Sequence, residues 1–137
     1  MAYATRQDYI DRFGVIELVQ LVDRDHDDVE DEGVLELALA DAGAEIDGYL
    51  SARYALPLAQ TPPALVRVCC DITRYRLYDS RATEEVRTRY SDAVKYLANV
   101  ANGVVQLGQA APSSENDAGA LFTSADRVFS ASKLRDY

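Results

Sequence analysis

The chain has 137 residues, of which 48% are hydrophobic and 27% are charged, and its formal net charge is −9. This length supports one domain with a buried core and excludes two domains of ordinary size. The acidic balance disfavours nonspecific nucleic-acid binding, because it repels the phosphate backbone. The charge is uneven, with a net of −10 over residues 1–60 (14 acidic and 4 basic side chains) and of +2 over residues 61–110 (5 acidic and 7 basic).

The beginning of the chain predicts two short helices. Thr5 is a good N-cap for a helix over residues 6–13, and Asp8 stands at its N3 position. Gly14 then ends this helix, because glycine is typical of the position just after a helical run. A second helix is predicted over residues 15–22, and its apolar side holds Ile16, Val19, Leu21 and Val22.

An aspartate-rich loop follows the second helix. Asp23, Asp25 and Asp27 alternate as the ligands of a calcium-binding loop do. The EF-hand pattern also needs glycine at loop position six and glutamate at position twelve, and here those positions hold Asp28 and Val34. The sequence therefore predicts a solvated acidic loop and no metal site.

Three longer segments repeat apolar residues every three or four positions, which is typical of helices that bury one face. They cover residues 32–54, 63–79 and 83–103, with Pro63 as a first helical residue and Thr83 as an N-cap. This periodicity predicts an all-α fold, a compact bundle of about four to five helices. The predicted core stripe holds Leu35, Leu39, Ile46, Leu50, Leu65, Val68, Ile72, Val86, Tyr90, Val94 and Leu97.

The C-terminal part differs in composition from the helical segments. Residues 104–108 are compatible with a short strand, and residues 109–120 have the composition of a linker. The last segment, residues 121–137, is too short to bury its own large apolar side chains. We therefore predict a helical bundle over residues 1–108, and a linker with an extended docking arm over residues 109–137. The predicted contact residues of the arm are Phe122, Arg127, Val128, Phe129, Leu134 and Tyr137.

The sequence carries no pattern typical of a catalytic or cofactor site. Cys69 and Cys70 are adjacent, cannot easily bridge each other and fit buried thiols in a reducing compartment. His26 is the only histidine, and no glycine-rich phosphate loop is present. We expect no enzyme activity, no metal and no cofactor. We also expect no signal peptide and no membrane span, because no apolar run approaches the roughly 18 residues that a span needs.

Arginine and tyrosine alternate over residues 73–90. Both residue types are typical of protein–protein hot spots, and they also serve in nucleic-acid binding. Acidic residues within and beside the run neutralise much of its charge, so intramolecular ion pairing is an open alternative. We predict that arginines of this run face carboxylates of a neighbouring subunit, and the candidates are Arg74, Arg76, Arg81 and Arg89. The alternative function is a helical module that binds nucleic acid through residues 73–90.

Several blocks of the sequence resemble the Mu-like bacteriophage head–tail connector family. They include RFG at residues 12–14, ELVQLVDRD at 17–25, IDGYLSARYALPL at 46–58 and DITRYRLYDSRATEEVRTRY at 71–90. The closing segments RVFS and LRDY, within residues 127–137, are similar to the end of the family. That family usually ends in a glycine–aromatic pair, and here Asp136 replaces the glycine.

The resemblance implies a structural protein of the virion neck, made in the host cytoplasm. Such connectors form a homo-oligomeric ring, commonly of about twelve copies, beneath the portal protein. The ring extends the DNA channel and docks the stopper or tail protein. DNA passes through this channel without specific binding, and the resemblance implies no catalysis, no cofactor and no membrane.

Overall fold

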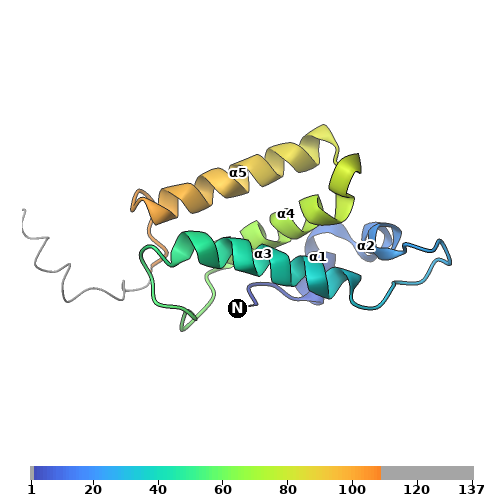
Figure 1. Ribbon diagram of the computed structural model, residues 1–137, viewed down its shortest axis with the longest axis horizontal. Helices are drawn as coiled ribbons and strands as arrows, with labels where there is room; N and C mark the ends of the chain where they lie inside the picture. Colours follow the sequence, from blue (N-terminus) through green and yellow to red (C-terminus); the bar gives the residue numbers. More distant parts are fainter. Residues whose placement is uncertain (1, 109–137) are drawn as a thin grey trace, which may run out of the picture.

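The computed structural model describes residues 2–108, and this part of the chain is all-α, as predicted (Figure 1). Residue 1 and residues 109–137 lie outside the described residues, and so do the predicted linker and docking arm. In chain order the helices are α1 (Arg6–Phe13), α2 (Val15–Val22), α3 (Val34–Leu50), α4 (Pro63–Tyr78), the 3₁₀ helix η1 (Asp79–Arg81) and α5 (Glu84–Ala101). None of the described helices is both long and apolar enough to cross a membrane.

The capping residues set the helix ends where the sequence predicts them. The Thr5 hydroxyl accepts the backbone N–H of Asp8 at 3.2 Å, and the Asp8 carboxylate accepts the backbone N–H of Thr5 at 2.9 Å. Gly14 has φ +92°, a conformation that separates α1 from α2 because only glycine adopts it without strain. At the start of α5, the Thr83 hydroxyl accepts the backbone N–H of Val86 at 3.3 Å.

One predicted helix has different ends in the structure, and one predicted strand does not form. The helix predicted over residues 32–54 is shorter at both ends, because Gly33 has φ +84° and the chain turns after Leu50. The strand predicted over residues 104–108 is absent from the described residues. Val104 and Val105 instead donate their backbone N–H groups to the Asn99 carbonyl at the end of α5, at 2.8 and 3.2 Å.

The main core lies between α3, α4 and α5, which pack against one another pairwise. The helix α4 is central, since it also contacts α1, α2 and η1. The predicted stripe is largely confirmed, although Leu39, Tyr90 and Val94 are only half-buried. Fully buried members of this core include Ile46, Leu50, Leu65, Val68, Ile72, Ala93, Leu97 and Val100.

A smaller core joins α1 and α2 to the start of α3 and the end of α4. Its buried side chains are Tyr9, Leu18, Leu21, Val22, Leu35, Ala38 and Leu77. The predicted apolar side of α2 was wrong at Ile16, which is 73% exposed, whereas its neighbour Leu18 is buried. The helix is therefore rotated relative to the prediction, with Leu18, Leu21 and Val22 toward the core and Glu17 toward Arg74 of α4.

Candidate subunit interaction surfaces

The four predicted interface arginines differ in how exposed they are and in whether they form ion pairs. Arg74 is only 9% exposed, whereas Arg76, Arg81 and Arg89 are exposed. Arg76 and Arg89 form ion pairs within the chain, with Glu45 and Glu85. Arg81 lies on η1 and forms no ion pair with another residue of the 2–108 range. The arm residues predicted to make contacts, from Phe122 to Tyr137, lie outside the described residues.

Arg74 joins α4 to α2. Its Nε and Nη2 atoms donate to the two carboxylate oxygens of Glu17 at 2.8 and 3.0 Å. The guanidinium carbon lies 4.3 Å from the ring centroid of Phe13, a distance typical of a cation–π contact. The Tyr9 hydroxyl also donates to Glu17, at 3.2 Å. Arg74 therefore takes the intramolecular pairing that the sequence left open.

The tyrosines of the arginine–tyrosine run are also used inside the chain. The rings of Tyr75 and Tyr90 are stacked, with centroids 4.1 Å apart and an interplanar angle of 9°. Glu45 accepts from Arg76 Nη2 at 2.7 Å and from the Tyr90 hydroxyl at 2.9 Å. Burial and this hydrogen bond to Glu45 raise the pKa of Tyr90 to about 12. One face of each ring is therefore used inside the chain.

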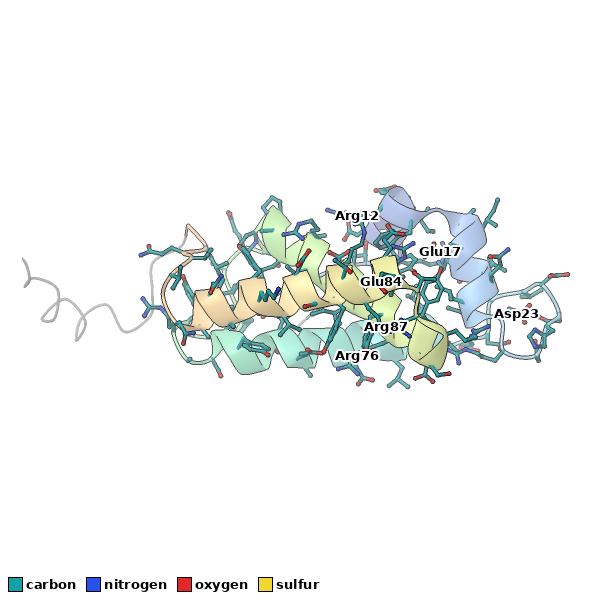
Figure 2. The ribbon with its side chains drawn as sticks, turned by 90° about the horizontal axis from the view of Figure 1, so that it is seen from above. Arg12, Glu17, Asp23, Arg76, Glu84 and Arg87 are labelled. Atoms are coloured by element: carbon teal, nitrogen blue, oxygen red, sulfur yellow. The ribbon has the colours of Figure 1, made fainter. Side chains whose placement is uncertain are left out.

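A groove lies between α1, α4 and the beginning of α5, and we call it the arginine groove. Its volume is about 400 Å³, and it is lined by Arg12, Phe13, Glu17, Arg67, Asp71, Arg74, Glu85 and Arg89. In Figure 2, Arg12 and Glu17 lie near the start of α5, away from Asp23 in the acidic loop. Sequence periodicity did not predict this groove, because its residues come from four separate helices.

Asp71 forms the floor of the arginine groove and is only 3% exposed. Its nearest cations are Arg67 Nη1 at 3.5 Å from Oδ2 and Arg89 Nη1 at 3.8 Å from Oδ1. No described residue forms a hydrogen bond with Oδ1. Burial raises the pKa of Asp71, and the nearby arginines only partly oppose this shift. Asp71 is therefore a buried carboxylate with incomplete pairing.

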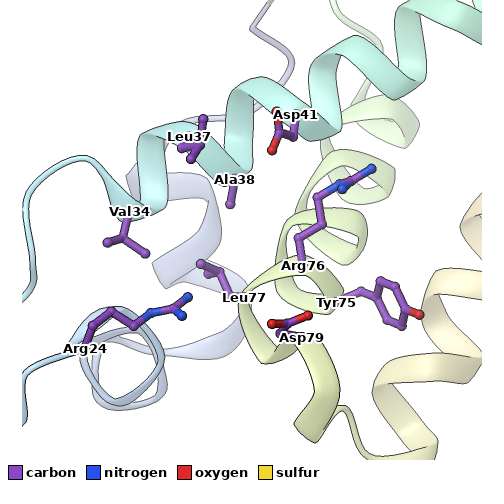
Figure 3. Close-up of a pocket in the computed structure, with 9 residues that line it drawn as sticks. All are labelled: Arg24, Val34, Leu37, Ala38, Asp41, Tyr75, Arg76, Leu77 and Asp79. Atoms are coloured by element: carbon purple, nitrogen blue, oxygen red, sulfur yellow. The ribbon is translucent and has the colours of Figure 1, made fainter.

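A second groove, the α3–α4 groove, lies at the other edge of α4 (Figure 3). Its volume is about 500 Å³. The first turns of α3 form one side with Val34 and Leu37, and the end of α4 forms the other side with Leu77. Asp41 and Asp79 also line it, and so do Arg24 and Arg76, so apolar, acidic and basic side chains share this surface.

The acidic loop between α2 and α3 is organised by its own hydrogen bonds. Asp23 accepts the backbone N–H groups of Asp27 at 3.1 Å and Asp28 at 2.7 Å, and Asp31 accepts that of Arg24 at 2.6 Å. One carboxylate oxygen from each of Asp23, Asp25, Asp27 and Asp31 lies within 4.8 Å of the others. Exposed acidic groups often gather without an ion, so the absence of a metal site stays a prediction.

The two cysteines lie inside the main core. Burial raises the pKa of Cys69 to about 11 and that of Cys70 to about 12. Both are therefore thiols at neutral pH, and the thiolate is the nucleophilic form of cysteine. His26, the single histidine, lies in the exposed acidic loop. Neither cysteine has the electropositive, accessible surroundings of a reactive thiol.

Comparison with known proteins relates nearly the whole chain to phage proteins. The model of the family described as Bacteriophage Mu, Gp36 matches residues 3–125. The chain is 38% identical over 129 residues to the Mu-like prophage FluMu protein gp36 of Haemophilus influenzae, covering 93% of this chain and 92% of that protein. It is 40% identical over 109 residues to gene product J of Escherichia phage Mu, covering 79% of this chain and 77% of that protein. The family match includes every described helix.

Proposed function

The chain belongs to the Bacteriophage Mu Gp36 family, and from this premise we propose that it is a structural protein of the phage particle, the head–tail connector. This membership confirms the resemblance to a Mu-like phage family that the blocks of sequence indicated. The observation that carries the proposal is the family match over residues 3–125, which covers the whole helical bundle. A small bundle with interaction grooves suits a protein that works by assembly.

The proposed connector is a closed ring of copies in the virion neck, beneath the portal protein. Rings form when one surface patch contacts a different patch on the next copy and the rotation closes. The chain offers an acidic loop and, elsewhere on its surface, three exposed arginines, two of which also pair within the chain. The exposed arginines Arg76, Arg81 and Arg89 lie at or near the end of α4 and the start of α5, and the acidic loop lies between α2 and α3.

Arg81 is the strongest candidate for this contact. It is exposed, and it has no ion-pair partner among residues 2–108, so its donors are available. Arg76 and Arg89 are paired with Glu45 and Glu85 at the surface, and surface pairs exchange partners at low cost. We therefore assign the contact with the acidic loop of the next copy first to Arg81, and then to Arg76 and Arg89.

The charge of the chain suits a DNA channel. Each copy carries a formal net charge of −9, and a ring of about twelve copies concentrates that charge. An acidic lumen repels phosphates, so DNA passes without binding to the wall. The proposed protein partners are the portal on one side of the ring and the stopper or tail protein on the other.

The test is to reconstitute the full-length chain with the portal protein encoded by the same phage. Native mass spectrometry and electron microscopy of the mixture are expected to show a ring of this chain on the portal. Arg81→Glu is expected to weaken the ring, because it places like charge opposite the acidic loop. Lys95→Glu makes the same charge change at an exposed site on α5 and serves as the control.

A chain that stays monomeric with the portal and is absent from purified virions contradicts the connector role. Steeply salt-dependent binding to DNA would instead favour the nucleic-acid module.

A further inference from the structure

The arginine groove is lined by four arginines and three carboxylates, and these charges are unequally paired. They belong to Arg12, Arg67, Arg74, Arg89, Glu17, Asp71 and Glu85. Both oxygens of Glu17 accept from Arg74, at 2.8 and 3.0 Å, and Glu85 accepts from Arg89 Nε at 3.1 Å. Each of these two carboxylates is therefore matched by an arginine, which leaves Arg12 and Arg67 with the single carboxylate of Asp71.

Arg12 and Arg67 have hydrogen-bond donors to spare at the rim of the groove. Both side chains are exposed, and Arg12 forms no ion pair with any residue of the 2–108 range. The one hydrogen bond that Arg12 donates within this range is to the Asp8 carbonyl, at 3.5 Å. Arg67 Nη1 lies 3.5 Å from Asp71 Oδ2, and 48% of the Arg67 side chain is exposed. Because a guanidinium carries five donors, these two cations can bind a further anion.

The floor of the groove offers an acceptor rather than a donor. Asp71 is 3% exposed, and its Oδ1 has no hydrogen-bond partner among the described residues, although Arg89 Nη1 lies 3.8 Å away. Buried polar atoms are nearly always hydrogen-bonded, and a buried acceptor without a donor costs free energy. An anion that only accepts hydrogen bonds, such as sulfate, would face this carboxylate with like charge. An anion that also donates a hydrogen bond would satisfy it.

We propose that the arginine groove binds an oxyanion that carries its own proton, which is hydrogen phosphate or a terminal phosphate ester. Its P–OH group donates to the Asp71 carboxylate, and its other oxygens accept from Arg12 and Arg67. Arg89, which is 48% exposed and pairs with Glu85 at the surface, swings outward from Oδ1 to admit the ligand and also donates to it. The groove, with a volume of about 400 Å³, accommodates a group of this size. This site does not require the proposed connector function.

Isothermal titration calorimetry of the full-length chain tests this site, with inorganic phosphate and sulfate as the two probes. Both are titrated at pH 7 in the same HEPES buffer and at equal ionic strength. Phosphate is expected to bind at least about tenfold more tightly than sulfate, because one hydrogen bond to a charged group is worth about this factor in an equilibrium constant. Phosphate that does not bind, or that binds no more tightly than sulfate, overturns the proposal.

Asp71→Asn tests whether this carboxylate makes the distinction between the two anions. The asparagine side chain keeps the shape of aspartate, but it carries no charge and its amide group can donate to sulfate. The variant is expected to bind sulfate more tightly than the natural chain does and to lose the preference for phosphate. If the affinities for both anions rise by the same factor, Asp71 acts only through its charge, and the proposal is overturned.

Two exposed arginines provide variants that leave the buried part of the groove unchanged. Arg12→Gln and Arg67→Gln should each lower the affinity for phosphate by about tenfold, because each removes a charge-assisted hydrogen bond to the anion. Lys95→Gln removes one positive charge from an exposed site on α5 outside the groove, and the affinity should be unchanged. Circular dichroism checks that all three variants are folded. An equal loss in all three variants, or no loss in the two arginine variants, contradicts the site.

A short oligonucleotide with either a 5′-phosphate or a 5′-hydroxyl end distinguishes the two sources of the ligand. The titration is done at about pH 6, where a terminal phosphate is close to its second pKa and retains a proton in part. Binding of the phosphorylated form alone, with loss in Arg12→Gln, identifies the ligand as a nucleic-acid end. Binding of neither form, with inorganic phosphate still bound, identifies it as free phosphate. Equal binding of both forms would come from internal phosphodiesters, which carry no proton, and would overturn the proposal.

Discussion

The main core and the smaller N-terminal core are held together by different interactions. The helices α3, α4 and α5 bury continuous apolar stripes, and the side chain of Ile72 at their centre is fully buried. The helices α1 and α2 have only eight residues each, and such helices are marginal alone. The ion pair between Glu17 and Arg74 adds to the apolar contacts of the smaller core in holding these two helices. In the first region the apolar pattern along each helix predicts which face is buried, whereas the ion pair of the second region joins residues 57 positions apart that no local pattern links.

The largest expected effect is in the main core. Ile72→Ala should lower the free energy of unfolding by about 2–5 kcal/mol, because it leaves a cavity at a fully buried site. Urea unfolding followed by circular dichroism measures this loss. The matched control is Ile16→Ala, which should change stability by less than about 0.5 kcal/mol because this side chain is exposed. Equal losses at the two sites would contradict the assignment of the core.

The second-largest effect on stability is expected from breaking the contact between the two regions. Glu17→Gln should lower the free energy of unfolding by about 1.5–3 kcal/mol, because it removes a charge-assisted pair and leaves Arg74 buried without its main partner. Amide hydrogen exchange should rise in α1 and α2 before it rises in α3 to α5. Glu32→Gln, an exposed change in the acidic loop, is the control. Unchanged exchange in α1 and α2 would mean that apolar contacts alone hold them.

A smaller effect is expected at the beginning of α1. Thr5→Ala removes the capping hydrogen bond to the Asp8 backbone and should lower the free energy of unfolding by about 1 kcal/mol. Thr5→Ser keeps the hydroxyl and should retain most of the stability. Thermal unfolding of the two variants compares them directly. If alanine and serine behave alike, the cap does not contribute to the stability of this region.

Replacing Asp71 should not lower the free energy of unfolding as replacing Glu17 does. Burial raises the pKa of Asp71 in the folded chain above its unfolded value. Its contribution to stability is therefore full below the unfolded pKa and is lost as the pH rises through the folded pKa. Asp71→Asn should cause no loss of stability at pH 7, and any gain over the natural chain should shrink as the pH falls through the raised folded pKa of Asp71 and be smallest below its unfolded value of about 4. Chemical unfolding at several pH values measures this. A loss at pH 7 as large as that of Glu17→Gln would show that the pairs with Arg67 and Arg89 stabilise the fold.

Calcium should have the smallest effect. The oxygens of Asp23 already accept backbone N–H groups, so this loop is organised without an ion. The melting temperature should be the same in excess calcium chloride and in a chelator, because an ion that binds only the folded chain would raise it. A rise that Asp25→Asn abolishes would instead reveal a calcium site.

The sequence by itself determined the helices, most of their ends and the family. Caps and stops act over about three or four residues, so Thr5, Gly14, Pro63 and Thr83 could be identified without knowledge of the fold. Apolar periodicity along a single helix likewise identified the stripe of the main core. The specific blocks of sequence identified a Mu-like phage family, to which the chain belongs.

Only the tertiary structure decided which side chains meet. The partner of Arg74 lies 57 residues away in the sequence, and nothing local distinguishes Glu17 from the other acidic residues of the chain. In the same orientation of α2, Leu18 is buried and Ile16 is exposed. Ion pairs and grooves between helices depend on how the helices are packed and rotated, and a pattern read along one helix carries no information about the rotation of another.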